Sequence, residues 1–107
     1  MAFQCAAGVC VMTELLNDVA LRRAPLSRSD VREMIDETRL GRLLAGYRGA
    51  PVADRAALED AILRLSALSV AHQDAIESID INPVLVLPEG EGCVAVDALI
   101  VKPEDEA

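Results

Sequence analysis

The last third of the chain contains two apolar runs that restrict its fold more than any other feature. Residues 79–88 (IDINPVLVLP) and residues 93–101 (CVAVDALIV) are rich in Val, Ile and Leu, and the segment PEGEG joins them. Apolar β-formers on both sides of a Gly-containing turn are typical of an antiparallel hairpin. Asn82 and Asp97 interrupt these runs. A carboxylate in so apolar a strand is costly to bury unless it is paired, hydrogen-bonded or bound to a metal.

The pairing of this hairpin decides whether Asn82 and Asp97 can act together. A turn centred between residues 90 and 91 places Asn82 opposite Leu99 and Asp97 opposite Val84. The two polar residues are then diagonal neighbours on one face, about 7–8 Å apart at the backbone. A loop of odd length would put them on opposite faces and remove the possibility of a joint site.

Asp80 has the same parity as Asn82, so it joins that face at its end. One amide oxygen with one or two carboxylates offers too few ligands for a calcium cage. Such a set suits Mg²⁺, which keeps several waters and takes other ligands from substrate phosphates. The structural alternative is that Asn82-Pro83 only shapes the start of a strand and that Asp97 caps a nearby backbone group.

The preceding residues predict strands followed by helices. Residues 9–23 read as two short strands with a turn or bulge at Asn17-Asp18, and the apolar segment before them also fits a strand. Ser27 and Asp30 form a capping-box pattern at the start of a helix. A short helical turn is expected at residues 40–44, with Gly46 as its stop.

Asp54 is expected to cap the longest helix, at about residues 54–70. Its core stripe is predicted to contain Leu58, Ala61, Ile62, Leu65 and Leu68, and Arg55, Glu59 and Arg64 are predicted to face water. The order β-β-α-α-β-β predicts an α+β fold, a two-layer sandwich with a mostly antiparallel sheet and helices on one face.

Composition narrows the classes of partner. The 107 residues carry 18 acidic and 10 basic side chains, a net charge of −8, and only 2% are aromatic. Such a chain repels phosphate backbones and anionic lipid, so we expect neither nucleic acid nor a membrane as partner. Three cysteines without a C-x-x-C pair and a single histidine predict reduced thiols and a cytoplasmic protein. Glu14 is expected to be a solvated charge at a sheet edge.

The segment IDINPVLVLPEGEGCVAVDALIV resembles the end of the ATP-grasp domain of NDP-forming (ADP-forming) acyl-CoA synthetases, which are related to the succinyl-CoA synthetase beta subunit. Those enzymes typically end in a D-I-N-P-L segment, a Gly-containing turn and an A-V-D-A strand. The stretches ELLNDVALRRAPLSRSDVREMI and LLAGYRGAPVADRAALEDAILRLSAL are also similar to the family, so the resemblance covers about residues 11–102.

The resemblance implies ATP- and Mg²⁺-dependent acid–CoA ligation through acyl-phosphate and phosphohistidine intermediates. Asn82 and Asp97 match the metal-ligand positions, and Asp80 matches the catalytic acidic residue close to the phosphates. Arg22 falls where the family carries a basic residue that faces the phosphates of the nucleotide, ATP or ADP. The phosphohistidine of the family lies on another domain, so His72 is expected to be an ordinary surface or capping residue.

The chain resembles only the C-terminal lobe of that domain. The first lobe, with its phosphate-binding Lys and Gly-rich loop, and the CoA-binding domain are expected as partners in cis or in trans; Lys102 is the only lysine. The predicted division is a divergent or non-native segment at residues 1–10, the lobe at residues 11–102 and an acidic tail at residues 103–107.

The lobe alone is expected to bind nucleotide weakly and to lack activity. Two alternatives remain open at this point. One is a non-catalytic module for interaction or homodimerisation, and the other is a regulatory lobe of a protein acyltransferase.

Overall fold

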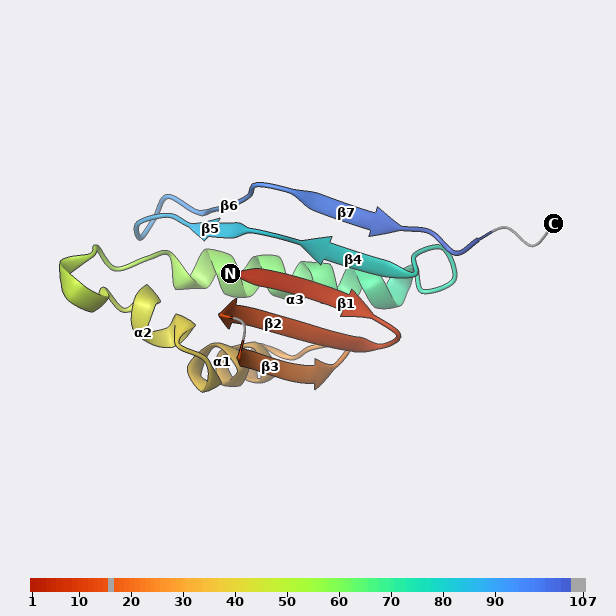
Figure 1. Ribbon diagram of the computed structural model, residues 1–107, viewed down its shortest axis with the longest axis horizontal. Helices are drawn as coiled ribbons and strands as arrows, with labels where there is room; N and C mark the ends of the chain where they lie inside the picture. Colours follow the sequence, from red (N-terminus) through yellow and green to blue (C-terminus); the bar gives the residue numbers. More distant parts are fainter. Residues whose placement is uncertain (16, 105–107) are drawn as a thin grey trace.

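A computed structural model describes residues 1–15 and 17–104 (Figure 1). The strands are β1 (Ala2–Ala6), β2 (Val9–Leu15), β3 (Asp18–Arg23), β4 (Ser78–Ile81), β5 (Val84–Val86), β6 (Cys93–Ala95) and β7 (Ala98–Val101). The helices are α1 (Arg28–Glu37), α2 (Leu40–Leu44), the 3₁₀ helix η1 (Tyr47–Gly49) and α3 (Arg55–Ala71). Part of the predicted acidic tail, residues 105–107, lies outside the described residues.

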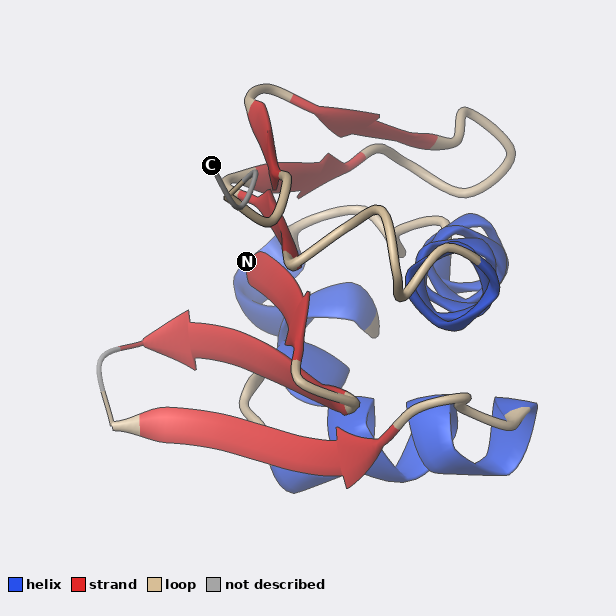
Figure 2. Cartoon of the chain, turned by 90° about the vertical axis from the view of Figure 1, so that its right-hand side faces the viewer, coloured by secondary structure: helices blue, strands red, loops and turns tan. Residues whose placement is uncertain are grey.

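Five strands form one antiparallel sheet in the order β3-β2-β1-β4-β7, and β5 pairs with β6 as a two-stranded extension. The helices lie on one side of the sheet, and the other side carries no layer in the described part of the chain (Figure 2). The predicted α+β fold, with a mostly antiparallel sheet and helices on one face, is therefore confirmed. We call the uncovered side the open face.

The N-terminal segment forms the middle of this sheet. β1 pairs with β2 on one side and with β4 on the other, so it joins the N-terminal hairpin to the C-terminal one. Its Phe3 is 1% exposed and packs in the core. The interpretation of residues 1–10 as divergent or non-native stays a prediction, but part of this segment supplies the central strand.

The expectation of reduced thiols is wrong for two of the three cysteines. Cys5 and Cys10 face each other across the β1–β2 hairpin and form a disulfide. The turn Ala7-Gly8 has two left-handed residues and joins the strands by a two-residue loop, which places Cys5 and Cys10 in the first closely spaced pair beyond the turn. Cys93 is a half-buried free thiol, and burial, with the nearby Asp54 charge, raises its pKa.

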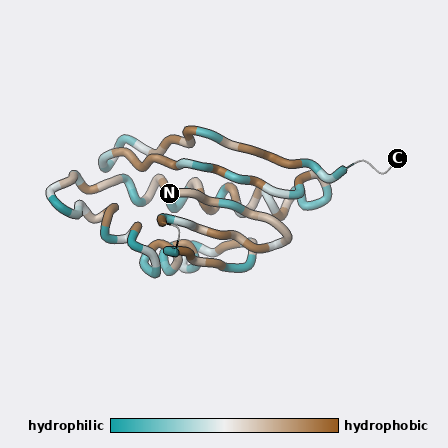
Figure 3. The backbone as a smooth tube through the Cα atoms, in the orientation of Figure 1, coloured by the Kyte–Doolittle hydropathy of each residue, from teal (hydrophilic) through white to brown (hydrophobic). Residues whose placement is uncertain are grey.

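The core lies between the sheet and the helices. One row of it crosses the sheet through Ala20, Met12, Phe3 and Ile81, all buried. α1 covers β3, and α3 runs along β1 and β4. Figure 3 shows the hydrophobic stretches along the strands and on α3. None of the helices in the described residues has the length and apolarity that crossing a membrane requires.

The predicted start of α1 and the predicted stop after α2 are confirmed. Ser27 accepts a hydrogen bond from the Asp30 backbone N–H, and Asp30 accepts one from the Ser27 backbone N–H, which completes the capping box. α2 ends at Leu44, and Gly46 has a φ of 93° in the left-handed region. A Cβ at Gly46 would lie 2.9 Å from the Ala50 carbonyl oxygen, so this position requires glycine.

α3 begins and ends within one residue of the prediction, but its buried stripe differs. Leu58 and Ile62 are buried as expected, whereas Leu68 is 37% exposed. Ser66 is buried instead and accepts a 2.7 Å hydrogen bond from the Leu26 backbone N–H. Glu59, predicted to face water, is 5% exposed because α1 covers it and supplies partners for its charge.

Candidate metal and nucleotide site

Asn82 and Asp97 lie directly opposite each other in the C-terminal hairpin. The Asn82 backbone N–H donates a 3.0 Å hydrogen bond to the Asp97 carbonyl oxygen, and the Val96 N–H donates a 2.9 Å bond to the Pro83 carbonyl oxygen. These bonds connect the β4–β7 ladder to the β5–β6 ladder. Both predicted long strands are therefore interrupted at the same level, one by the cis peptide Asn82-Pro83 and the other by Val96-Asp97.

The predicted register is wrong by two residues, although its parity is right. Asp80 pairs with Leu99 and Val84 pairs with Ala95, which makes Asn82 and Asp97 direct rather than diagonal neighbours. The turn is centred between Glu89 and Gly90: the Glu91 N–H donates to the Pro88 carbonyl oxygen, and Gly90 has a φ of 87°. Gly90 thus occupies the third position of the turn, where a positive φ is required.

Asp80, Asn82 and Asp97 share the open face of the sheet. Ile79 and Ile81 of β4 are buried in the core, so strand alternation puts Asp80 and Asn82 on the other side. Asp97 lies opposite Asn82 and takes the same face. Asn82 and Asp97 are exposed and Asp80 is half-buried. The three polar groups therefore meet on the side of the sheet that no helix covers.

The Asp97 carboxylate has one oxygen engaged and no ion pair in the described residues. Its Oδ1 accepts a 2.9 Å hydrogen bond from the Ala98 backbone N–H. This bond is the backbone cap that the structural alternative predicts, but it leaves Oδ2 available. No arginine among the described residues pairs with the carboxylate.

The donor set fits a cation that brings most of its own ligands. In the described part of the chain, no group of three or more His, Cys, Asp or Glu side chains is arranged to hold a metal ion. Asn82 and Asp97 offer hard oxygen donors at one level of the hairpin, with Asp80 next to them. Mg²⁺ is commonly bound by one or two carboxylates together with waters and phosphate oxygens.

Arg22 lies apart from these residues. It is on β3, at the opposite edge of the sheet from β7, and its partner across the ladder, Cys10, is buried in the core. Its guanidinium pairs with Glu37 and, at 4.0 Å, with Glu33, both on α1. The structure thus places Arg22 on the helix-covered side, and its role toward nucleotide stays a prediction.

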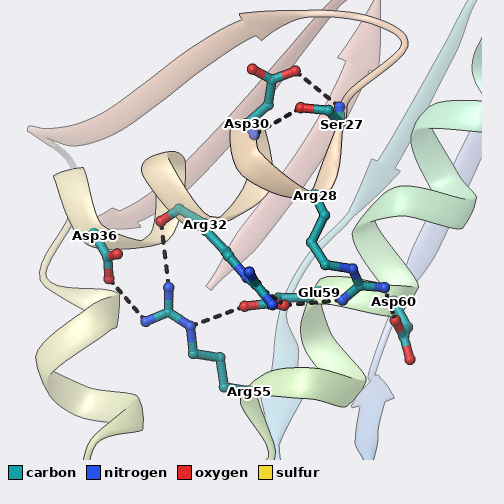
Figure 4. A network of polar contacts seen from close by, with 8 residues as sticks. All are labelled: Ser27, Arg28, Asp30, Arg32, Asp36, Arg55, Glu59 and Asp60. Carbon is teal, nitrogen blue, oxygen red and sulfur yellow. Dashed lines mark hydrogen bonds and ion pairs between the residues drawn. The ribbon is translucent and has the colours of Figure 1, made fainter.

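No sequence pattern predicted the cluster of charged side chains around Glu59. Arg28 and Arg32 of α1 and Arg55 of α3 all donate to its carboxylate, at 3.0, 3.3 and 3.1 Å (Figure 4). Burial alone would raise the pKa of Glu59, but the hydrogen bonds from the three guanidinium groups outweigh it and lower the pKa. The cluster fastens α1 to α3 behind the sheet and makes no contact with the open face.

Glu14 also differs from its prediction. It lies on β2, an inner strand, and its side chain is only 15% exposed rather than solvated at an edge. Its Oε2 is buried without a hydrogen-bond partner among the described residues, 3.9 Å from the N-terminal nitrogen. His72 is exposed and lies at the C-cap of α3, as predicted.

The family model of the ATP-grasp domain matches residues 6–101. The chain belongs to the ATP-grasp domain family. It is 42% identical over 91 residues to the beta subunit of ADP-forming acetate–CoA ligase II of Pyrococcus furiosus, a match that covers 85% of this chain and 39% of that protein. It is 42% identical over 84 residues to ADP-forming acetate–CoA ligase I of Archaeoglobus fulgidus, covering 78% of this chain and 12% of that protein.

Solved structures agree with this assignment. A protein from Pyrococcus horikoshii superposes with a TM-score of 0.84 at 30% identity, covering 97% of this chain and 48% of that one. An acetyl-coenzyme A synthetase of Candidatus Korarchaeum cryptofilum, solved with coenzyme A and Mg-AMPPCP, gives a TM-score of 0.84 at 31% identity, covering 95% and 52%. The chain is therefore a partial ATP-grasp domain of the ADP-forming acyl-CoA synthetase type and spans about half of these structures or less.

Proposed function

We propose that Asn82 and Asp97 bind a divalent cation, Mg²⁺, together with the phosphates of ATP or ADP, as the contribution of this ATP-grasp lobe to acid–CoA ligation. The proposal is supported chiefly by the direct opposition of an amide and a free carboxylate oxygen on the open face. The relative solved with Mg-AMPPCP is consistent with this ligand class. When bound, Mg²⁺ would neutralise charge on the phosphate oxygens during phosphoryl transfer.

Each polar residue has a distinct part in this proposal. Asn82 supplies an uncharged oxygen and Asp97 supplies Oδ2, because Oδ1 is fixed by the Ala98 N–H. Fixing one oxygen orients the carboxylate before the ligand arrives, which reduces the ordering cost of binding. Asp80 would act beside the transferred phosphoryl group. Arg22 lies on the helix-covered side and is bound to Glu37, so its contribution to a site on the open face would be the weakest of the four.

The chain alone would bind nucleotide weakly and catalyse nothing. An ATP-grasp site encloses nucleotide between two lobes, and the open face presents one wall only. The first lobe and the CoA-binding domain would be supplied by other parts of the ligase. Incubating the 107-residue chain with acetate or propionate, ATP and CoA should therefore yield no acyl-CoA above background.

Calorimetry with Mg·ADP tests the metal site. We expect weak binding to the wild-type chain and its loss in Asp97→Asn, because that variant keeps an oxygen for the Ala98 N–H but removes the charge that attracts the cation. Asp74→Asn is the matched control: Asp74 is also exposed, but it lies in the loop after α3. It removes the same charge and should bind like the wild type.

The alternatives give different results in the same experiment. A non-catalytic interaction module would bind no Mg·ADP and would show a concentration-dependent dimer by sedimentation. Equal loss of binding in Asp97→Asn and Asp74→Asn would show that only the overall negative charge matters, and would contradict a site at Asp97. A regulatory lobe of a protein acyltransferase could share the nucleotide site, but every named relative described above is a CoA ligase or synthetase.

A further inference from the structure

A second surface, independent of the open face, lies on the helix-covered side at the end of the molecule that carries α2. A groove of about 920 Å³ runs between the β2–β3 end of the sheet, the C-terminal end of α1, α2 and η1. Three arginines line it, together with three large apolar side chains. They are Arg39, Arg42, Arg48, Leu15, Leu43 and Tyr47, and we call this surface the arginine groove.

The arginines of this groove are unpaired, whereas most of its acids are engaged. In the described residues, Arg39, Arg42 and Arg48 form no ion pair with a carboxylate. By contrast, Asp36 pairs with Arg55 and Glu37 pairs with Arg22.

The other two acids of the groove are also accounted for. Asp18 accepts a 2.7 Å hydrogen bond from the Arg39 backbone N–H, and Glu14 lies 3.9 Å from the N-terminal nitrogen. The groove therefore contains a local excess of free guanidinium groups, although the net charge of the chain is −8.

The loop that carries Arg48 is shaped to expose it. Gly46, Arg48 and Gly49 all have positive φ, and 58° at Arg48 is a left-handed conformation that is unfavourable for a non-glycine residue. The loop is closed by a 2.9 Å hydrogen bond from the Ala53 N–H to the Leu44 carbonyl oxygen. Arg48 lies over the exposed Tyr47 ring, 5.3 Å from its centre, and no carboxylate within residues 1–15 and 17–104 forms an ion pair with it that would explain its position.

We propose that the arginine groove docks an acidic, partly apolar segment of a partner subunit. Arginine and tyrosine are enriched at protein–protein interfaces, and the two exposed leucines add apolar surface beside them. Leu15, Leu43 and Tyr47 are 51%, 44% and 47% exposed, a large apolar surface that a phosphate ion would leave uncovered. The chain as a whole is acidic and repels such a segment, so electrostatic attraction favours the groove over the acidic parts of the surface.

The test uses fluorescently labelled octaglutamate as the probe, with the 107-residue chain at low and at physiological salt. We expect saturable binding that weakens as salt is added. Arg42→Gln/Arg48→Gln should weaken it roughly tenfold, as expected for removing two charged anchors of an interface. The matched control is Arg23→Gln/Arg64→Gln, which removes the same charge from two exposed arginines outside the groove. It should bind like the wild type.

Amide chemical shifts locate the probe. Octaglutamate should move the signals of residues 39–48 and leave those of residues 80–98 unchanged, so failure of the metal site and failure of the groove are distinguishable. Absence of octaglutamate binding, equal weakening in both double variants, or shifts outside the groove would overturn the proposal. Tighter binding of inorganic tripolyphosphate with the same dependence on Arg42 and Arg48 would assign the groove to phosphates and also overturn it.

Discussion

At the scale of single residues, Glu59 illustrates how one buried charge is stabilised by contributions from two helices. Its carboxylate is nearly excluded from solvent, and the three guanidinium groups around it reach out to water. Removing the arginines would leave a buried charge unpaired, whereas removing the carboxylate would leave solvated cations. Burying the Glu59 carboxylate therefore costs little free energy only while all three arginines donate to it.

Glu59→Gln should lower the free energy of unfolding by about 1–3 kcal/mol at neutral pH, because a buried charge-assisted acceptor is lost. The folded pKa of Glu59 is lowered, so its stabilisation is complete above the pKa of the unfolded carboxyl group. It is lost as the pH falls through the folded pKa. Urea unfolding across this acidic range should therefore show the wild type and the variant converging as pH decreases.

Asp60→Asn is the control for this prediction. Asp60 shares Arg28 with Glu59, but its side chain is 54% exposed, so this variant should destabilise the chain far less than Glu59→Gln does. Equal destabilisation by the two variants would mean that Glu59 acts as an ordinary surface charge. A gap that persists at low pH would mean that the stabilisation does not come from the charge of Glu59.

At the scale of elements, α1 is defined by signals that lie close together in the sequence. Ser27 and Asp30 satisfy each other's backbone N–H groups, and Val31, Met34 and Ile35 form its buried stripe. Cap and stripe together fix where the helix begins and which side faces the sheet. The alignment of α1 against α3 therefore depends partly on this capping box.

Ser27→Ala should destabilise the chain by about 1 kcal/mol, because the Asp30 N–H at the start of α1 loses its acceptor. Ser29→Ala, two residues further on in the same turn, removes an exposed hydroxyl and should change stability by less than about 0.5 kcal/mol. Thermal unfolding followed by circular dichroism measures both. A Ser29 effect as large as that of Ser27 would show that the cap contributes nothing specific.

Local signals also explain how far the hairpin could be predicted. Because side chains alternate between the two faces along a strand, every hairpin loop of even length puts Asn82 and Asp97 on the same face. Their shared face could therefore be predicted from the sequence. The register could not. A turn centred between residues 90 and 91 has Glu91 in its third position, and the sequence does not say whether a glycine of PEGEG occupies that position instead. In the structure Gly90 does, and this moves the whole ladder by two residues.

Three other features of the fold could not be predicted from local sequence patterns. Glu59 meets Arg28 and Arg32 only after α1 and α3 pack, so its burial has no local signal. The Cys5–Cys10 disulfide depends on a two-residue turn built from Ala7-Gly8, and alanine is not a typical residue for a left-handed position. Burial of Ser66 likewise depends on a partner forty residues away.

At the scale of the whole molecule, the two proposed functional surfaces lie on different sides of one sheet. Helices cover one side and shape the arginine groove at one end, while the open face presents Asp80, Asn82 and Asp97. Exposed apolar residues also lie on the open face: Leu99 is directly opposite Asp80, and Leu21 is on β3 at the other edge of the sheet. Such a face is suited to closing over a ligand against a second lobe, in agreement with a chain that spans part of an ATP-grasp domain.

The most direct test of the central proposal is paramagnetic mapping with Mn²⁺, which replaces Mg²⁺ at oxygen sites, in the presence of ADP. Amide signals of an isotope-labelled chain lose intensity in proportion to their closeness to the bound ion. We predict that residues 80–82 and 96–98 broaden first, at the lowest Mn²⁺ concentration. Sharp signals at both segments while other acidic stretches broaden would contradict a metal site formed by Asn82 and Asp97.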